Sequence, residues 1–290
     1  MTASKTTNAV RAEILIQALP YIKEYRGKCI VAKYGGNAMT DPNLKKSVME
    51  DILLLHMMGV KVVLVHGGGP DINRMLSALH IESHFENGLR VTPPETMEVV
   101  QMVLAGKVNK GLVADLSSLG GKAAGLCGID GNMIQVHTAS EKLGLVGEID
   151  HVDPSIIENL LSGGFIPVIS SVGVDKHGQP HNINADTAAA KVAAALHAEC
   201  MIVMSNINGV YMDKDDPSTL IKELTVAEAE QLEADGVIAG GMIPKVDCCT
   251  NAVKEGVRKV FIINGETPHA TLIELLTDEG LGTMFTASRG

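Results

Sequence analysis

The sequence has no tryptophan, and aromatic residues of all kinds make up 3% of its 290 residues. Proteins that bind nucleic acid stack bases on aromatic side chains and hold phosphates on basic surfaces. Here acidic residues outnumber basic residues by 34 to 24, which gives a formal charge of −10. Both features argue against a nucleic-acid partner and favour a small-molecule ligand. An acidic protein that binds an anion must gather its cations locally, so cations in glycine-rich loops carry the most weight.

The five cysteines form no C-x-x-C pair, and their number is odd. A reducing compartment is therefore expected, and a disulfide framework is not. No apolar run approaches the roughly 20 residues that a membrane helix needs, and the first residues lack the apolar core of a secretory signal. We expect a cytoplasmic protein without a membrane partner. Residues 1–12 carry basic residues without an acid, as a transit peptide would, but the spacing after Glu13 fits a mature helix better.

Several familiar catalytic motifs are also absent. The sequence contains no P-loop, no G-x-G-x-x-G dinucleotide turn, no G-x-S-x-G elbow and no H-E-x-x-H metal pattern. P-loop nucleotide binding, dinucleotide oxidoreduction and zinc chemistry of these kinds are therefore not expected, and neither is a protein-held metal. His66 follows an apolar run and is expected to be a hydrogen-bonded core residue.

Apolar runs alternate with helical segments along most of the chain. Strands are predicted within 29–36, 60–69, 165–173, 199–209 and 258–265, and helices near 43–58, 70–80, 186–198, 226–234 and 244–256. The strand runs are apolar throughout, which indicates burial on both faces, as in a parallel sheet covered by helices. We predict an α/β fold, a three-layer αβα sandwich around a mainly parallel open sheet. Residues 125–152 are predicted to form an antiparallel excursion over that sheet.

The first predicted helix covers residues 8–24. Apolar residues recur there at spacings of three to four, from Val10 to Ile22, which is typical of an amphipathic helix. Such a helix either packs on its own domain or contacts another subunit. The pattern alone does not separate these two alternatives.

Two glycine clusters follow predicted neighbouring strands. Lys33 ends one apolar run just before Gly35 and Gly36, and Gly67–Gly69 end the next just before Pro70. Proline favours the first turn of a helix, so the second cluster is expected to lie at a helix N-terminus. Exposed N–H groups and an ammonium both favour an anion. A tight turn explains one such cluster, but two together favour a phosphate site.

Polar residues in three other segments can complete such a site. Arg90 lies in a loop where its guanidinium can hold a carboxylate through two hydrogen bonds, although a solvated arginine is the simpler alternative. Asn182, Asn184 and Asp186 alternate before an alanine-rich helix, which suits a polar ligand, although Asp186 can also be an ordinary first-turn acid. Lys245 is expected at a helix N-terminus, where a surface cation is mildly unfavourable, so a functional role is favoured.

The segment SNINGVYMDKDDPSTLI follows a predicted strand and then turns acidic. Its residues Asn206, Asn208, Gly209 and Tyr211 can hold the base and ribose of a nucleotide, with an ordinary surface loop as an equal alternative. Lysines, glycine loops and an aspartate without an evident nucleophile or base fit phosphoryl transfer to a carboxylate. That acceptor is already ionised at pH 7, so catalysis reduces to positioning and to neutralising the repulsion between two anions. Mg²⁺ bound to the nucleotide would help to neutralise this repulsion.

Five motifs in this order and spacing resemble the amino-acid kinase family, and within it the N-acetylglutamate kinases of arginine biosynthesis. They are KYGGN, VHGGGP, NGLRVTP, NxNAD and GGMIPKV, and the resemblance runs from about residue 10 to residue 286. It implies the amino-acid kinase fold. It also implies a reaction in which MgATP phosphorylates N-acetyl-L-glutamate to the γ-acyl phosphate N-acetylglutamyl 5-phosphate.

The resemblance also implies a role for each matching residue. Lys33 and Lys245 would stabilise the transferring phosphoryl group, and Asp186 would orient both lysines. The N-acetylglutamate site would include Gly68, Gly69, Arg90, Asn182 and Asn184, with Arg90 on the α-carboxylate. Gly35, Gly36 and Gly68 would donate N–H groups to phosphate oxygens, and Asn206, Asn208, Gly209 and Tyr211 would belong to the ATP site. Residues 28–185 would then form an N-lobe for substrate and dimerisation, and 186–290 a C-lobe for ATP.

The N-terminal helix and the C-terminal tail are similar to those of the arginine-inhibited subgroup. This implies that residues 1–27 serve oligomerisation, that the assembly is a homohexamer built as a trimer of dimers, and that L-arginine is an inhibitor. Glu274 and Gly280 match arginine-site positions, but Phe261 stands where related inhibited enzymes often have a histidine. A non-catalytic arginine sensor of the same fold is the alternative, against which both lysines and Asp186 count.

Overall fold

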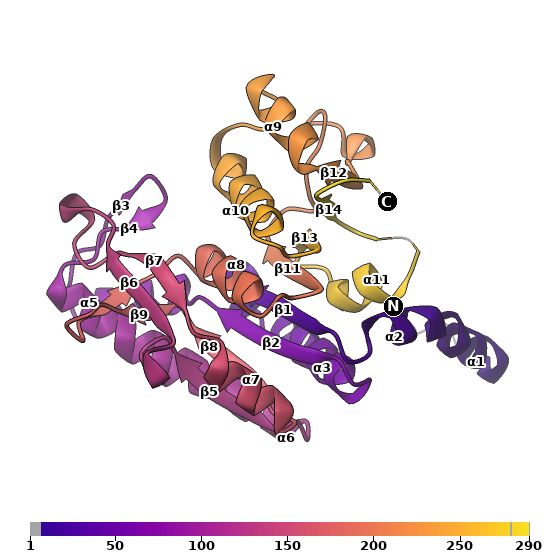
Figure 1. Ribbon diagram of the computed structural model, residues 1–290, viewed down its shortest axis with the longest axis horizontal. Coiled ribbons are helices and arrows are strands. Elements are labelled where there is room, and N and C mark those ends of the chain that lie inside the picture. The colour runs from indigo at the N-terminus through magenta and orange to yellow at the C-terminus, as the bar shows by residue number, and fades with distance from the viewer. Residues whose placement is uncertain (1–6, 279, 290) are drawn as a thin grey trace.

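The computed structural model describes residues 7–278 and 280–289, and its centre is an eight-stranded sheet (Figure 1). The six strands from β13 to β5 run parallel, and β14 and β12 run the opposite way. The predicted, mainly parallel sheet is therefore confirmed. In order across the sheet the strands are β12 (Glu223–Thr225), β14 (Thr283–Thr286), β13 (Lys259–Asn264), β11 (Cys200–Ser205), β1 (Cys29–Tyr34), β2 (Lys61–His66), β8 (Ile166–Ser170) and β5 (Ala123–Cys127).

Helices cover both faces of this sheet, which confirms the three-layer αβα architecture (Figure 1). Side chains alternate along β1, so Ala32 and Tyr34 enter the core on one face, and Val31 enters the core on the other. Lys33 shares its face with Val31. The first face carries α3 (Pro42–Met57), α4 (Gly69–Ala78), α5 (Pro94–Gln101), α6 (Asn109–Ser118) and α11 (Ala270–Leu276), and the second carries α7 (Ser155–Ser162), α8 (Ala185–Ala195), α9 (Val226–Ala234) and α10 (Ile243–Lys254).

The predicted core helices near 43–58, 70–80, 186–198, 226–234 and 244–256 are confirmed as α3, α4, α8, α9 and α10, each of which begins within one residue of its predicted start. The long helical segment α5–η2–α6 was not among the predicted helices. Its middle part η2 (Met102–Val108) is a π-helix. None of the helices in the described residues is long and apolar enough to span a membrane.

A four-stranded sheet forms the predicted excursion. It contains β10 (Pro180–Asn182), β9 (Val172–Val174), β6 (Ile134–Thr138) and β7 (Gly147–Val152), and β6 pairs antiparallel with β7. The predicted start at residue 125 is wrong, because residues up to Cys127 pair with β8 at the edge of the main sheet. Gly125 inside this short strand weakens its strand signal. A separate hairpin, β3 (Phe85–Glu86) and β4 (Leu89–Arg90), precedes α5.

The single N-terminal helix predicted over 8–24 is instead two helices, α1 (Asn8–Gln17) and α2 (Leu19–Tyr25). Pro20 lies in the first turn of α2, where its missing N–H costs no helical hydrogen bond, so it starts a new helix after Ala18. Helix α1 buries no residue and extends away from the rest of the molecule (Figure 1). The alternative in which this helix packs on its own domain is therefore wrong for α1. Helix α2 does pack on the domain, because it buries Tyr25.

Candidate active site

The predicted site residues gather where the parallel strands β2, β1, β11 and β13 end. In open α/β sheets, this carboxyl edge is where ligands bind. The loops at this edge are tied to one another, because Gly67 N donates to Tyr34 O (3.1 Å) and Gly265 N donates to Ser205 O (2.8 Å). The first bond joins the loop after β2 to the end of β1, and the second joins the loop after β13 to the end of β11. The loops that end these four neighbouring strands are called the polar rim.

Lys33 and Asp186 form an ion pair at the centre of this rim, with Lys33 Nζ 2.8 Å from Asp186 Oδ1. Lys33 is the last but one residue of β1 and projects from the face that α8 covers. Asp186 lies in the first turn of α8, and the helix cap there is Asn184, whose Oδ1 accepts from Asp186 N (2.8 Å). Asp186 is thus a first-turn acid by position, and its carboxylate holds a lysine from the sheet.

Lys245 approaches the same carboxylate from a different helix. It is the third residue of α10, after Pro244 in the predicted first turn, and its Nζ lies 3.9 Å from Asp186 Oδ2. Burial on its own would raise the pKa of Asp186, but the attraction of Lys33 and Lys245 outweighs burial and holds that pKa below its usual range. The aspartate is therefore ionised at neutral pH. Two ammonium groups beside one carboxylate leave a net positive charge, which favours a bound anion.

The glycines after β1 allow the backbone to pass beside this charge. A β-carbon on Gly35 would lie 2.9 Å from Lys33 Nζ, so a side chain at this position would displace the end of the lysine. Gly36 then begins the 3₁₀ turn η1 (Gly36–Met39). Among the described residues, no acceptor is recorded for the N–H groups of Gly68 and Gly69 at the start of α4. Both glycine clusters therefore lie where they can donate to an anion.

Arg90 is buried and already anchored, so the alternative of a solvated loop arginine is wrong. Its Nη2 donates to Asn73 Oδ1 (2.6 Å), its Nη1 donates to Ser83 Oγ, and the guanidinium carbon lies 4.6 Å from the centroid of the Phe85 ring. Burial lowers the pKa of Arg90 from its usual value, although an arginine remains charged. The sequence analysis missed Asn73 and Ser83; the position of Asn73 one turn after Gly69 was the available signal for the first.

Asn182 reaches the Arg90 segment through Thr92. Its Nδ2 donates to Thr92 Oγ1 (3.1 Å), and that hydroxyl donates to Arg90 O (2.7 Å). Asn182 is the last residue of β10, so the small sheet and the β4 segment meet at this point. The structure thus brings together Asn182 and Arg90, while the side-chain oxygen of Asn184 is used as a helix cap.

The segment Asn206–Tyr211 lies on the opposite side of β1 from Gly68. Asn208 Nδ2 donates to Tyr211 Oη (2.8 Å), and Asn264 Nδ2, at the end of β13, donates to Asn208 Oδ1 (2.9 Å). Because β1 separates β2 from β11 and β13, Lys33 lies between two groups of polar loops.

Within the described residues, no three His, Cys, Asp or Glu side chains are grouped so that they could hold a metal ion. The acid nearest the two lysines, Asp186, is occupied by Lys33. A metal ion at this site would therefore depend on oxygen ligands from bound phosphates, as Mg²⁺ often does.

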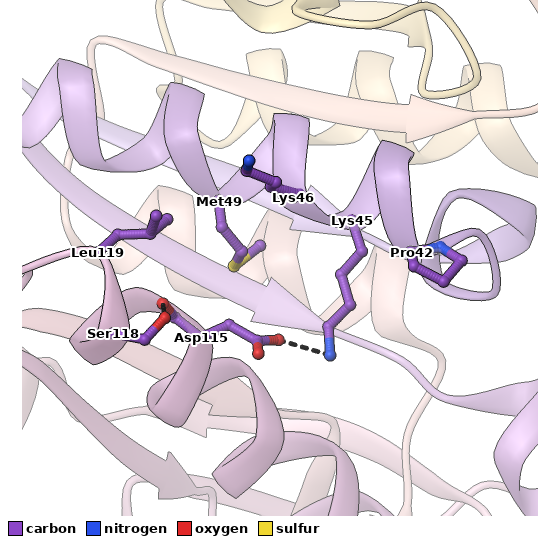
Figure 2. Close-up of a pocket in the computed structure, with 7 residues that line it drawn as sticks. All are labelled: Pro42, Lys45, Lys46, Met49, Asp115, Ser118 and Leu119. Carbon is purple, nitrogen blue, oxygen red and sulfur yellow. Dashed lines mark hydrogen bonds and ion pairs between the residues drawn. The ribbon is translucent and has the colours of Figure 1, made fainter.

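The cavity in Figure 2 is not part of this rim. It measures about 310 Å³ and lies between α3 and α6, on the face of the sheet opposite to α8. Lys45 faces it, but the ammonium is held by Asp115 at 2.5 Å (Figure 2). None of its lining residues is a predicted site residue.

A second cavity, of about 550 Å³, contains the predicted arginine-site residues Glu274, Gly280 and Phe261. Glu274 Oε2 accepts from the N–H groups of Leu281 (2.6 Å) and Gly282 (2.9 Å). The structure thus brings the three predicted residues together. Around them the wall also includes Tyr21, Glu24, Lys222, Lys259 and Asp278.

Comparison with known sequences assigns the fold to a family. The amino acid kinase family matches residues 28–264. The chain belongs to the amino acid kinase family. An acetylglutamate kinase from Brachyspira hyodysenteriae is 52% identical over 96% of this chain and 98% of that protein, and one from Synechococcus sp. is 50% identical over 99% and 97%. Within the family, the chain therefore groups with the acetylglutamate kinases.

Two solved structures are similar to this chain in fold. The N-acetylglutamate synthase from Neisseria gonorrhoeae, complexed with coenzyme A and N-acetyl-glutamate, superposes with a TM-score of 0.84 at 27% identity. The match covers 96% of this chain but only 64% of that longer protein. Carbamate kinase from Giardia lamblia, bound to AMP-PNP, has a TM-score of 0.67 at 17% identity over 90% of this chain and 99% of its own, which shows a shared fold.

Proposed function

We propose that this protein transfers the γ-phosphoryl group of MgATP to the γ-carboxylate of N-acetyl-L-glutamate, giving N-acetylglutamyl 5-phosphate and ADP in arginine biosynthesis. The observation that carries the proposal is the cluster of Lys33, Asp186 and Lys245 between two groups of polar loops. Relatives named acetylglutamate kinase at about 50% identity over nearly the full chain support the choice of substrate.

The chemistry needs no protein base. A γ-carboxylate oxygen of N-acetylglutamate forms a bond to the γ-phosphorus, the bond to the β,γ-bridging oxygen breaks, and ADP leaves with that electron pair. Lys33 and Lys245 stabilise the negative charge on the equatorial oxygens of the transferring phosphoryl group. This stabilisation is stronger in the transition state than with either substrate anion bound alone. Asp186 is ionised and holds Lys33 in position, so it orients the lysines and takes no proton.

On the substrate side, Gly68, Gly69, Asn182 and Asn184 are proposed to lie around N-acetyl-L-glutamate, with Arg90 on its α-carboxylate. A guanidinium has five N–H donors, and the contacts with Asn73 and Ser83 use two of them. Arg90 is therefore rigidly held and still has donors for a ligand. This preorganisation lowers the entropy cost of binding a carboxylate in one orientation.

On the nucleotide side, Gly35, Gly36 and Gly68 are proposed to donate N–H groups to phosphate oxygens. Asn206, Asn208, Gly209 and Tyr211 would then lie along the ribose and base. Mg²⁺ would be bound mainly by the phosphate oxygens and would neutralise part of their charge. Lys33 lies between the two groups of loops, so both substrates would approach it.

The test is formation of an acyl phosphate. Purified protein is incubated with MgATP, hydroxylamine and N-acetyl-L-glutamate, and the ATP-dependent hydroxamate is measured. Free glutamate and carbamate serve as alternative acceptors under the same conditions. We expect hydroxamate from N-acetylglutamate at rates far above those from glutamate. Failure to form it with active-site lysines intact would contradict the proposed reaction.

L-Arginine inhibition is proposed for the cavity that contains Glu274. Its acids Glu24, Glu274 and Asp278 suit the cationic groups of arginine, and Lys222 and Lys259 suit its carboxylate. Phe261 fills the wall where related inhibited enzymes often carry a histidine, so the inhibition is expected to be weak. Phe261→His should lower the arginine concentration needed for half-inhibition, with Phe261→Leu as the matched control. An enzyme that ignores arginine in all three forms would contradict this site.

A further inference from the structure

His66 is a fully buried histidine directly before the second glycine cluster. Its Nδ1 lies 2.8 Å from Gly67 O, and its Nε2 lies 3.1 Å from Asn109 Nδ2. A carbonyl oxygen can only accept, so Nδ1 carries the hydrogen and Nε2 accepts from the amide. Burial lowers the pKa of His66 to about 4, so the ring is neutral at pH 7. The prediction of a hydrogen-bonded core histidine is confirmed.

Asn109 fixes this arrangement from the other side. Its buried Nδ2 also donates to Val168 O (2.8 Å) and approaches Leu126 O (3.2 Å), while Lys110 Nζ donates to its Oδ1 (3.1 Å). Two carbonyls and one ammonium thus require the amide to present its NH₂ group to the ring. The side chain of Asn109 is placed by backbone groups of β8 and β5 and selects one tautomer of His66.

The π-helix η2 brings the same helical segment onto the glycine loop. A β-carbon on Gly68 would lie 2.7 Å from Leu104 Cδ2 and 3.2 Å from Val108 Cγ2, both in η2. Asn109 follows directly after η2. π-Helical turns occur often at functional sites because they shift the register of the side chains that follow. Here one segment both packs on Gly68 and supplies the amide for His66.

The hydrogen bond from His66 to Gly67 O also sets the direction of the peptide group between Gly67 and Gly68. Every described peptide bond is trans, and the C=O and N–H of a trans peptide point in opposite directions. Because His66 holds Gly67 O toward the core, the N–H of Gly68 in the same peptide points away from the core. Gly67 N is used by Tyr34 O and Gly68 O by Ile72 N, whereas no described residue accepts from Gly68 N.

We infer that His66, fixed by Asn109, is a positioning residue that aims the Gly68 N–H at the oxygens of the transferring phosphoryl group. This inference rests on the proposed function for the identity of the anion. His66 itself touches no substrate and moves no proton. A donor that is aimed before the reaction stabilises developing charge without reorganisation, which is the basis of oxyanion-hole catalysis.

Two substitutions at one position test the inference. In His66→Asn, the side-chain amide can replace Nδ1–H as donor to Gly67 O, whereas His66→Leu removes the donor. We expect His66→Leu to lower kcat about 10²-fold, the loss seen when one preorganised donor is removed, with KM values for ATP and N-acetylglutamate within about threefold. His66→Asn should recover most of kcat. Equal losses in both variants, or a loss confined to KM, would overturn the inference.

A measurement on the protein without substrate tests the role of His66 independently of the proposed reaction. It also keeps the test possible if His66→Leu fails to fold. Long-range ¹H–¹⁵N spectra of ¹⁵N-histidine-labelled wild type at pH 7 should show an Nδ1–H tautomer for His66, assigned among the ten histidines by its loss in His66→Asn. Asn109→Leu should change that pattern. An Nε2–H tautomer in wild type would overturn the positioning role. Absence of hydroxamate with the expected tautomer would instead refute the proposed reaction.

Discussion

Lys33 Nζ lies 2.8 Å from Asp186 Oδ1, and this pair joins the central strand β1 to the first turn of α8. The ammonium is therefore held at the edge of the sheet before any substrate binds. A charge that is already in position costs no reorganisation when the phosphoryl group is transferred. In the proposed reaction, the pair would give Lys33 the positioning that a phosphate loop gives its own lysine.

The two lysines should affect turnover more than binding. Lys245→Ala is expected to lower kcat about 10²–10³-fold, with substrate KM values changed only a few-fold, because its charge acts mainly on the transition state. Lys254→Ala is the matched control, since Lys254 lies in the same helix and pairs with Glu230 on the surface. Steady-state kinetics check both variants. A KM effect alone would assign Lys245 to ground-state binding.

Gly35→Ala should impair activity more than stability. The new methyl group would lie 2.9 Å from Lys33 Nζ, and the flexible end of a lysine can move aside at low cost. That movement breaks the contact with Asp186, so kcat is expected to fall at least tenfold, the cost of about 1.4 kcal/mol in the transition state. Gly111→Ala in α6, where a β-carbon meets no atom within 4 Å, is the control for activity. Thermal unfolding of both variants completes the comparison.

Stability should depend on pH through Asp51, whose carboxylate is 1% exposed and lies 2.6 Å from His269 Nδ1. Burial raises the pKa of Asp51 from 3.8 to about 6, against the opposing effect of His269. The folded state then binds this proton more tightly than the unfolded chain. The protonated Asp51 carboxyl therefore stabilises the folded state fully below pH 3.8, and this stabilisation is lost as the pH rises through 6.

Asp51→Asn should remove this dependence. Between pH 4 and pH 7 the wild type is expected to lose roughly 2 kcal/mol of unfolding free energy relative to Asp51→Asn, because most of the shift of about two pKa units acts within this range. Urea unfolding at both pH values measures it. A relative gain by the wild type over this range would show that attraction to His269 outweighs burial.

Removal of residues 1–17 should change assembly and leave the core intact. Helix α1 buries none of its residues, and Ile14, Leu15 and Ile16 are exposed. Exposed apolar side chains on a helix without a partner are typical of an interface. The deletion is expected to give a smaller particle by light scattering with little change in kcat. Leu15→Glu in the full chain should have the same effect, and an unchanged particle size in both would refute the interface.

Much of the site could be predicted because its signals are local. Lysine beside glycine, proline in a first helical turn and amides before an alanine run each mark a position at the end of a strand or the start of a helix. Alternation in β1 then places Lys33 on the α8 side. The partners of Arg90 could not be found in this way, because Asn73 and Ser83 reach it only through tertiary packing.

The missed parts of the fold have similar causes. The helical segment 94–118 contains a π-helix that breaks the 3.6-residue period, and Gly106 and Gly111 weaken its helix propensity. The division of α1 from α2 at Ala18 was missed because the apolar spacing continues across it. The signal for a new helix was Pro20, which lies in the first turn of α2. Local patterns therefore identified many of the elements, but they missed the helical segment 94–118 and did not give every boundary.

Strand β13 connects the cavity that contains Glu274 to the proposed nucleotide loop. Lys259 and Phe261 near its start line the cavity with Glu274, and Asn264 at its end holds Asn208 of the proposed nucleotide loop. A six-residue strand is about 20 Å long, and β13 pairs with β11 along its whole length and with β14 from Val260 to Ile262. If L-arginine and ATP bind at these two places as proposed, displacement of β13 is a route by which one ligand would influence the other without a separate regulatory domain.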